Sequence, residues 1–162
     1  MRVSDVMTRD VACCSPDDPL TAPARIMWEH DCGTVPVIEP ESRKALGMIT
    51  DRDICMAAFL KDRPLREAIV REVMSRELHS CSPEHDLSQA ERVLREHQVR
   101  RLPVVDKQDR LLGIISLADI ARAAKDGGSR REVPPEELAD TLGVISQRRS
   151  PPAETRESPR AR

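Results

Sequence analysis

An internal repeat is the feature that most constrains how this chain can fold: residues 3–54 and 70–120 are two copies of one pattern. Met7 matches Met74 at an offset of 67, and the offset falls to 66 after a one-residue deletion in a turn. The matched segments keep the same order along both copies. A repeat of this length predicts one fold unit used twice.

Each copy predicts the same series of elements. A short helical segment ends at Met7 or Met74, a brief extended piece follows, and a helix comes next. Two short strands joined by a polar turn then indicate an antiparallel hairpin, and a last helix begins near Asp51 or Leu117. The expected extended pieces and strands are 11–14, 34–38 and 46–50 in the first copy and 78–81, 101–105 and 111–116 in the second.

Prolines limit where these elements can run. Pro36 and Pro103 lie within expected strands and have no N–H to donate, so they should lie at an edge or a bulge. Pro23 lies where the first long helix should run, so that helix either starts late, with Thr21 as its cap, or is kinked. Two acidic residues are candidate caps of the long helices, Asp18 and Asp86.

The size of one unit decides the fold class. A β-α-β-β-α unit of about 50 residues buries too little core to be stable alone, whereas two such units can pack together. We therefore predict an α/β (α+β) fold of two half-modules related by a pseudo-two-fold axis, followed by a C-terminal helix and a disordered tail. The predicted divisions are 1–62 for the first motif, 63–125 for the second, 126–147 for a linker and helix, and 148–162 for the tail.

Composition excludes several classes of function. The net charge is −2 and the pI is near 6.1, so no basic field attracts nucleic acid or anionic lipid. Trp28 and Phe59 are the only aromatic residues, which leaves no platform for stacked bases. No stretch is apolar enough to span a membrane, and the N-terminal residues show no signal peptide. We expect a cytoplasmic protein that binds neither nucleic acid nor membrane.

The five cysteines are expected to be free thiols, because their number is odd and no export signal is seen. Free cysteines are most often small buried apolar residues. The adjacent pair Cys13 and Cys14 nevertheless leaves a redox or metal role open. No CxxC pair, catalytic triad spacing, P-loop or GxGxxG is present, so we expect neither a metal site nor an enzyme.

The ordered motifs resemble a tandem pair of CBS domains, the unit called a Bateman module, over about residues 3–125. The resemblance is to free-standing bacterial CBS-domain proteins. The motifs that carry it are Asp5-Val6-Met7, Gly33-Thr34-Val35-Pro36-Val37, Gly47-Met48-Ile49-Thr50-Asp51-Arg52-Asp53-Ile54, Val73-Met74, Arg100-Arg101-Leu102-Pro103-Val104-Val105 and Gly113-Ile114-Ile115-Ser116-Leu117-Ala118-Asp119-Ile120.

The resemblance implies a regulatory ligand-binding module rather than an enzyme. Such modules sense adenosine-containing nucleotides (AMP, ADP, ATP or similar) in the cleft between the two motifs and signal to an unidentified partner protein. They require no cofactor beyond this AMP- or ATP-type ligand. They usually form homodimers, as a flat disc of four motifs.

A Thr/Ser-x-x-Asp pattern follows the second hairpin strand of each copy, as Thr50–Asp53 and Ser116–Asp119. A carboxylate at this position can accept hydrogen bonds from both hydroxyls of a ribose, and the hydroxyl side chain can reach a phosphate or the ribose. The pattern also opens a helix, whose unpaired N–H groups favour an anion. The alternative is a capping box that needs no ligand, and the two roles can coexist.

The two copies differ in the cations near this pattern. Arg52 lies inside the first pattern, and Arg100 and Arg101 precede the second copy's strand, where the first copy has Gly33 and Thr34. The resemblance implies that Arg100 and Arg101 face a phosphate held by the other copy's aspartate. We therefore predict one phosphate-competent cleft at Asp53, and a second cleft, without a cation, that is empty or takes an uncharged nucleoside. The alternative is that these arginines bind no ligand and belong to a solvated charged face or to surface ion pairs.

An adenine ring needs apolar walls. The resemblance assigns these to the start of each copy, where the candidates are Val11, Ala12, Cys13, Leu78 and His79. Such side chains are more often plain core. A ligand-free dimerisation or interaction scaffold is therefore the alternative function, in which the aspartates serve only as caps.

Overall fold

The computed structural model describes residues 1–61, 63–126 and 133–147, and the predicted tail at 148–162 lies outside the described residues. The first copy forms the helices and strands α1 (Val3–Val6), α2 (Thr21–Glu29), β1 (Thr34–Ile38), β2 (Ala45–Thr50) and α3 (Asp51–Lys61). The second forms the 3₁₀ turns η1 (Leu65–Glu67) and η2 (Val70–Glu72), then α4 (Leu87–Glu96), β3 (Arg101–Val105), β4 (Leu111–Ser116) and α5 (Leu117–Asp126), and α6 (Pro135–Ile145) follows.

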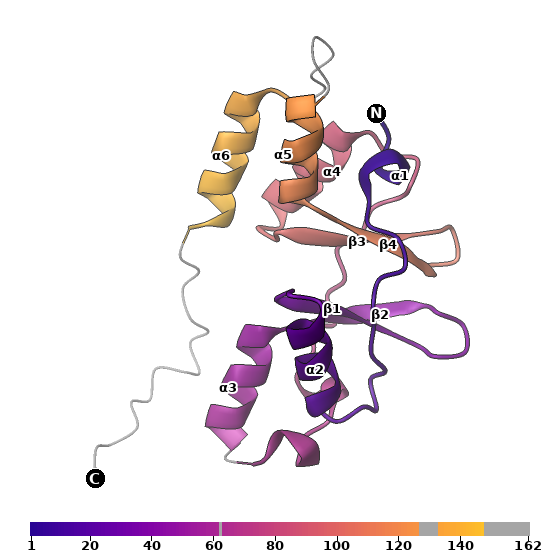
Figure 1. Cartoon of the computed structure of the whole chain (residues 1–162), viewed down its shortest axis with the longest axis vertical. Coiled ribbons are helices and arrows are strands. Elements are labelled where there is room, and N and C mark those ends of the chain that lie inside the picture. The colour runs from indigo at the N-terminus through magenta and orange to yellow at the C-terminus, as the bar shows by residue number, and fades with distance from the viewer. Residues whose placement is uncertain (62, 127–132, 148–162) are drawn as a thin grey trace.

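The two copies are stacked as two halves of one molecule (Figure 1). The hairpins β1–β2 and β3–β4 face each other across the middle, while α2 and α3 lie on one outer side and α4, α5 and α6 lie on the other. This is the predicted mixed fold of two similar half-modules. Both aspartate patterns lie where β2 and β4 pass into α3 and α5, beside the boundary between the halves.

The two hairpins have the same register. Thr34 pairs with Thr50 in the first, Arg101 pairs with Ser116 in the second, and a bulge falls near the end of β1 and of β3. The extended piece before each long helix forms only one parallel bridge, from Cys14 to Val37 and from Cys81 to Val104.

Both strand prolines lie where a missing N–H costs nothing. The Cys14 N–H donates to the Pro36 carbonyl at 3.1 Å, and the Cys81 N–H donates to the Pro103 carbonyl at the same distance. A residue's carbonyl and nitrogen point to the same side of a strand. The proline nitrogens therefore face away from β2 and β4, which confirms the predicted edge position.

The helix starts agree with the sequence in part. Asp86 caps α4, in a reciprocal capping box with Gln89. The helix α2 does start late, but Thr21 is its first residue rather than its cap, and Pro23 lies in the first turn, where an N–H would have no partner. Asp18 does not cap it either, because the Asp18 carboxylate accepts the Ser15 N–H at 2.8 Å and closes a turn.

The segment at the start of each copy, which runs to Thr8 in the first copy and to Ser75 in the second, packs on the other copy. We call it the leading segment. The Val3 N–H donates to the His85 carbonyl at 2.8 Å, and Thr8 exchanges two hydrogen bonds of 2.9 Å with Ile114 of β4. In the second copy, Ser75 exchanges the equivalent pair, of 2.9 and 3.2 Å, with Met48 of β2. Each half is therefore built from both copies, which ties the halves together and brings α1 beside α5.

Two aliphatic cores follow from this exchange. Val3 and Met7 are buried with the second copy's Leu102 and Ile115, while Val70 is buried with the first copy's residues. The core of the first half consists of Cys14, Leu20, Met27, Val35, Val37, Ile49, Ile54, Ala57, Ala68 and Val70. Apolar area removed from water in these two clusters is the main favourable contribution to folding.

The C-terminal helix α6 covers α4 and α5 of the second half (Figure 1). Ile145 joins the second core, and the Gln98 amide donates to the Val144 carbonyl at 3.4 Å. Glu91 of α4 and Thr141 of α6 are both fully buried, and the Thr141 hydroxyl donates to Glu91 Oε1. Glu91 Oε2 has no hydrogen-bond partner among the described residues.

Candidate functional site

The Thr50–Asp53 pattern closes on itself at the start of α3. Asp53 Oδ2 accepts the Thr50 N–H at 2.9 Å and the Thr50 hydroxyl at 2.7 Å, and the Asp53 N–H donates back to Thr50 Oγ1 at 3.2 Å. The capping alternative is therefore realised in the structure. It uses one carboxylate oxygen of Asp53, and no described residue donates a hydrogen bond to the other, Oδ1.

The Ser116–Asp119 pattern has the same geometry. Asp119 Oδ2 accepts the Ser116 N–H at 2.8 Å and the Ser116 hydroxyl at 2.6 Å, and the Asp119 N–H donates to Ser116 Oγ at 3.2 Å. The difference lies in the second oxygen, because Asp119 Oδ1 accepts a hydrogen bond from the Arg122 guanidinium. The position that matches Arg122 in the first copy is Met56, which cannot close Asp53 in this way.

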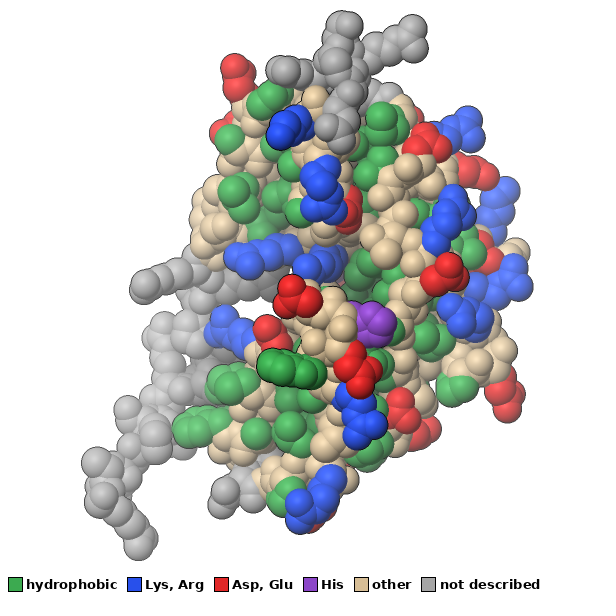
Figure 2. Space-filling view, viewed as in Figure 1, with side chains coloured by type: hydrophobic (Ala, Val, Ile, Leu, Met, Phe, Trp, Pro, Cys, Tyr) green, Lys and Arg blue, Asp and Glu red, His purple; other side chains and the backbone are tan. Residues whose placement is uncertain are grey.

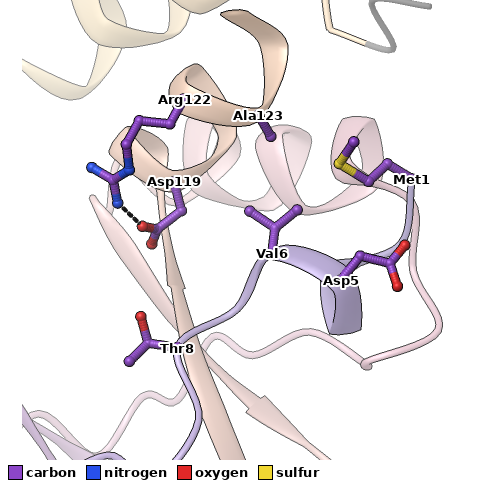
Figure 3. Close-up of a pocket in the computed structure, with 7 residues that line it drawn as sticks. All are labelled: Met1, Asp5, Val6, Thr8, Asp119, Arg122 and Ala123. Atoms are coloured by element: carbon purple, nitrogen blue, oxygen red, sulfur yellow. Dashed lines mark hydrogen bonds and ion pairs between the residues drawn. The ribbon is translucent and has the colours of Figure 1, made fainter. Parts of the chain in front are cut away.

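A pocket of about 490 Å³ lies beside Asp119 (Figure 3). Its walls come from both copies, because α1 and Thr8 belong to the first and α5 to the second. The lining residues are Met1, Asp5, Val6, Thr8, Asp119, Arg122 and Ala123. In Figure 3 the Asp119 carboxylate lies between Arg122 and Thr8.

The sequence interpretation missed part of this pocket. It gave the Asp119 cleft no cation, whereas Arg122 supplies one a single turn further along α5. The i, i+3 spacing from Asp119 to Arg122 was a visible signal for this ion pair. The α1 residues had no such signal, because only the exchange of leading segments brings them to α5.

The three predicted phosphate-binding arginines remain unpaired with any acid in the described part of the chain. Arg52 and Arg100 are exposed and Arg101 is half-buried at the start of β3. The Arg100 carbonyl accepts the Leu117 N–H at 3.1 Å, so the backbone of this arginine pair lies against the start of α5. Figure 2 shows Lys or Arg and Asp or Glu side chains together at the boundary between the halves.

The predicted wall residues are half-buried. Val11, Ala12 and Cys13 precede the bridge from Cys14 to β1, and burial raises the pKa of the Cys13 thiol, against a smaller opposing effect of Arg43.

The matching residues of the second copy, Leu78 and His79, hold a feature that the sequence did not indicate. The His79 ring stacks on the His97 ring, with centroids 3.7 Å apart and planes 13° apart. His79 Nε2 also lies 3.6 Å from Glu77 Oε1.

Comparison with known proteins gives consistent matches. The family model described as "CBS domain" matches residues 3–59 and 70–126. The CBS domain-containing protein YhcV of Bacillus subtilis is 42% identical over 119 residues, which are 74% of this chain and 82% of that protein. Hypoxic response protein 1 of Mycobacterium tuberculosis is 36% identical over 118 residues, 73% of this chain and 81% of that protein.

Solved structures show the same fold. Hypoxic Response Protein I, with two coordinated zinc ions, superposes with a TM-score of 0.68 at 34% identity, over 75% of this chain and 98% of that one. CBSX2 in complex with AMP superposes with a TM-score of 0.67 at 25% identity, over 76% of this chain and 96% of that one. The CBS domain pair of MJ0100 has 22% identity and a TM-score of 0.67, and shows the fold alone.

Two kinds of feature are absent from residues 1–61, 63–126 and 133–147. No group of three or more His, Cys, Asp or Glu side chains there could hold a metal ion. No helix in this part of the chain has the length and hydropathy of a membrane span.

Proposed function

The chain belongs to the CBS domain family, as a tandem pair, and from this premise we propose that it is a regulatory module that binds an adenosine-containing nucleotide such as AMP, ADP or ATP between its two copies. The observation that carries the proposal is the open carboxylate oxygen of Asp53. Its other oxygen is fixed by Thr50, so the side chain is held in one orientation before any ligand arrives. Such preorganisation lowers the cost of binding.

The chemistry of the predicted site at Asp53 suits a ribose phosphate. An ionised carboxylate accepts hydrogen bonds from the ribose hydroxyls, and these charge-assisted bonds are the strong ones. Arg52, Arg100 and Arg101 have no acidic partner among the described residues, so binding a phosphate would break no existing ion pair. Arginine suits this role because its planar group can donate two parallel hydrogen bonds to a phosphate.

The adenine ring of the ligand needs apolar walls, which the carboxylate and the arginines do not provide. We assign it to the half-buried segment Val11, Ala12 and Cys13 and to its counterpart Leu78 and His79. The AMP complex of CBSX2, which has the same fold, supports adenosine as the ligand class.

The Asp119 cleft should be the weaker site. Arg122 occupies the carboxylate oxygen that a ribose would need, and the cost of separating this ion pair is subtracted from the binding energy. A phosphate that drew Arg122 away from Asp119 could offset this cost. The pocket beside it therefore remains a second candidate site, of lower affinity.

The remaining features of the proposal concern assembly and location. We propose a homodimer that signals to a protein partner, acts without catalysis and works in the cytoplasm. The alternative is a ligand-free scaffold, and one observation favours it: both capping boxes are complete without a ligand.

Calorimetric titration with AMP, ADP and ATP distinguishes the two functions. We expect at least one ligand to bind, and to stabilise the fold by about 2.7 kcal/mol at 100 times its dissociation constant. The Asp53→Asn variant keeps a capping oxygen but loses the charge, so it should retain the fold and lose most of the affinity. Asp119→Asn is the matched control and should lose less.

Two outcomes would decide against the proposal. Absence of heat and of thermal stabilisation with every adenosine ligand at millimolar concentration would leave the scaffold as the function. Equal loss of affinity in Asp53→Asn and Asp119→Asn would show that the open carboxylate oxygen is not what distinguishes the two clefts.

A further inference from the structure

The turns of the two hairpins meet at the boundary between the halves, and both lie on the right-hand side of Figure 1. Residues 43–45 of the first turn and residues 109–111 of the second form one antiparallel bridge, which we call the turn clasp. Its two backbone hydrogen bonds are 2.9 and 3.0 Å long and are donated by Ala45 and Leu111. Each half thus donates one bond of the clasp to the other half.

The turn clasp is the direct backbone connection between the halves. The hydrogen bonds that Val3, Thr8 and Ser75 make to the other copy lie within one half, because the leading segments have already crossed over. Among the backbone hydrogen bonds between described residues, only the two of the clasp join one half to the other. The clasp therefore fixes the starts of β2 and β4 relative to each other.

The clasp and the aspartate patterns lie at opposite ends of the same two strands. β2 runs from Ala45 to Thr50, and β4 runs from Leu111 to Ser116. At about 3.3 Å per residue, the two ends of each strand lie roughly 17 Å apart. A side chain of the clasp therefore does not contact a ribose held at Asp53, although the clasp affects how the halves are spaced there.

The clasp places two cations opposite each other. Lys44 and Arg110 are the non-hydrogen-bonded pair of the bridge, the kind of pair in which side chains approach most closely. Like charges directly opposite on two strands are destabilising. Each cation has an acid beside it: Lys44 Nζ lies 3.4 Å from Asp109 Oδ2, and Arg110 Nε lies 2.7 Å from Asp106 Oδ2. The two acids offset the repulsion across the bridge.

Asp106 also holds the second turn in shape. Its Oδ1 accepts the Gln108 N–H and the Arg110 N–H, both at 2.9 Å, and its carbonyl accepts the Asp109 N–H at 3.0 Å. These donors, the Arg110 N–H above all, hold the pKa of Asp106 below its usual range against a smaller opposing effect of desolvation. The Asp109 carbonyl, which accepts the clasp bond from Ala45, belongs to this turn.

The first turn has a different arrangement at the matching position. Glu39 matches Asp106 in the repeat, and its carboxylate accepts the Ser42 hydroxyl at 2.6 Å. The cation of this turn, Lys44, pairs with Asp109 of the other copy. The charges of the clasp are therefore balanced from the second turn, by Asp106 and Asp109.

We infer that Asp106 is a positioning residue for the nucleotide site: through the turn clasp it fixes the spacing of the two halves, without contact to the ligand. This role presupposes the proposed function, in which a nucleotide binds between the two copies. Without the Asp106 carboxylate, Arg110 faces Lys44 unpaired, and their repulsion opens the clasp. The halves then vary in spacing at the far ends of β2 and β4, and the site loses preorganisation.

Calorimetry of the Asp106→Ala variant with AMP, ADP and ATP tests this role. We expect the affinity for the tightest of the three to fall by roughly fivefold or more, because apparent affinity scales with the fraction of molecules in the binding-competent spacing. Hydrogen exchange measured by NMR should show faster exchange of the Ala45 amide, in the other copy, as well as of the Leu111 amide. Glu84→Ala removes an exposed acid elsewhere in the second copy and should change neither measurement.

A disulfide across the clasp provides a rescue. The Cα atoms of a non-hydrogen-bonded pair are about 4.5 Å apart, which a disulfide can span. Lys44→Cys with Arg110→Cys, oxidised in the Asp106→Ala background with the exposed Cys55 replaced by Ser, should restore the affinity of the Cys55→Ser protein. Reduction should remove the rescue. A purely local role of Asp106 in its turn would not be corrected by a bond between two other residues.

The outcomes separate this role from the proposed function. A chain that binds no nucleotide would overturn both. Nucleotide binding that is equally tight in Asp106→Ala would overturn the positioning role alone, and so would weakened binding that the disulfide does not restore. If Asp106→Ala is unfolded by circular dichroism, Asp106→Asn, which keeps an acceptor oxygen and loses the charge, takes its place in the same comparison.

Discussion

Two matched cysteines show how burial sets the chemistry of a single residue. Cys14 and Cys81 each bridge the extended piece before a long helix to the hairpin of the same copy, and they are 4% and 2% exposed. Burial raises the pKa of each thiol to about 12, with a smaller contribution from Asp18 at Cys14. The raised pKa values leave little thiolate at neutral pH, which argues against the redox role that the Cys13–Cys14 pair left open.

The raised pKa predicts a loss of stability in alkali. The folded pKa lies above the unfolded value of about 8.5, so between these values the unfolded chain loses a proton that the folded chain keeps. The contribution of these thiols to the free energy of unfolding is complete below pH 8. It falls as pH rises, by up to about 1.4 kcal/mol per pH unit for each thiol. Urea unfolding at a series of alkaline pH values measures it. A Cys14→Ala, Cys81→Ala variant should show a shallower fall, and an equal fall in both proteins would contradict the argument.

At the scale of elements, two glycines allow the exchanged segments to cross the hairpins. A Cβ added to Gly47 in β2 would lie 2.2 Å from the Ser75 carbonyl oxygen, and one added to Gly113 in β4 would lie 2.5 Å from the Thr8 carbonyl oxygen. Neither oxygen can move easily, because both belong to backbones that are hydrogen-bonded to the same strands. The repeated glycines are therefore explained by close backbone approach rather than by a turn.

Substitution of these glycines should be costly. We expect Gly47→Ala and Gly113→Ala each to destabilise the fold by about 1–3 kcal/mol, the usual range for overpacking. Gly143 in α6 has nothing within 4 Å of an added Cβ, so Gly143→Ala should instead stabilise by up to about 1 kcal/mol. Thermal unfolding of the three variants measures both the expected losses and the expected gain in stability. A neutral Gly47→Ala would show that the crossing is looser than the structure indicates.

At the scale of the whole molecule, the two halves depend on each other. Val3 is fully buried in the core of the second half although it belongs to the first copy, and Val70 is fully buried in the first half although it belongs to the second. The division at residues 62 and 63 thus separates the copies along the sequence but does not separate the cores.

Paired substitutions should reveal this dependence. We expect Val3→Ala to cost about 2 kcal/mol and to increase amide exchange in β3 and β4 more than in β1 and β2. Val70→Ala should cost a similar amount and give the reverse pattern. Hydrogen exchange followed by mass spectrometry resolves the four strands. The dependence of each half on the other copy's leading segment would be contradicted if each variant mainly affected the hairpin of its own copy.

The sequence by itself determined the repeat, the hairpins and the aspartate patterns, because these depend on residues close together in the chain. The strands expected at 34–38, 101–105 and 111–116 form at those positions, and local hydrogen bonds hold each aspartate to its own hydroxyl residue. Local periodicity and capping rules are sufficient for such features.

Only the tertiary structure decided what differs between the two copies in space. The exchange of leading segments, the pocket that α1 forms with α5, and the covering of one half by α6 all join residues far apart in the chain. Nearest-neighbour patterns carry no information about such contacts. The two copies share one series of elements in the sequence, whereas packing gives one an internal cover and leaves the other with Trp28 and Phe59 at its surface.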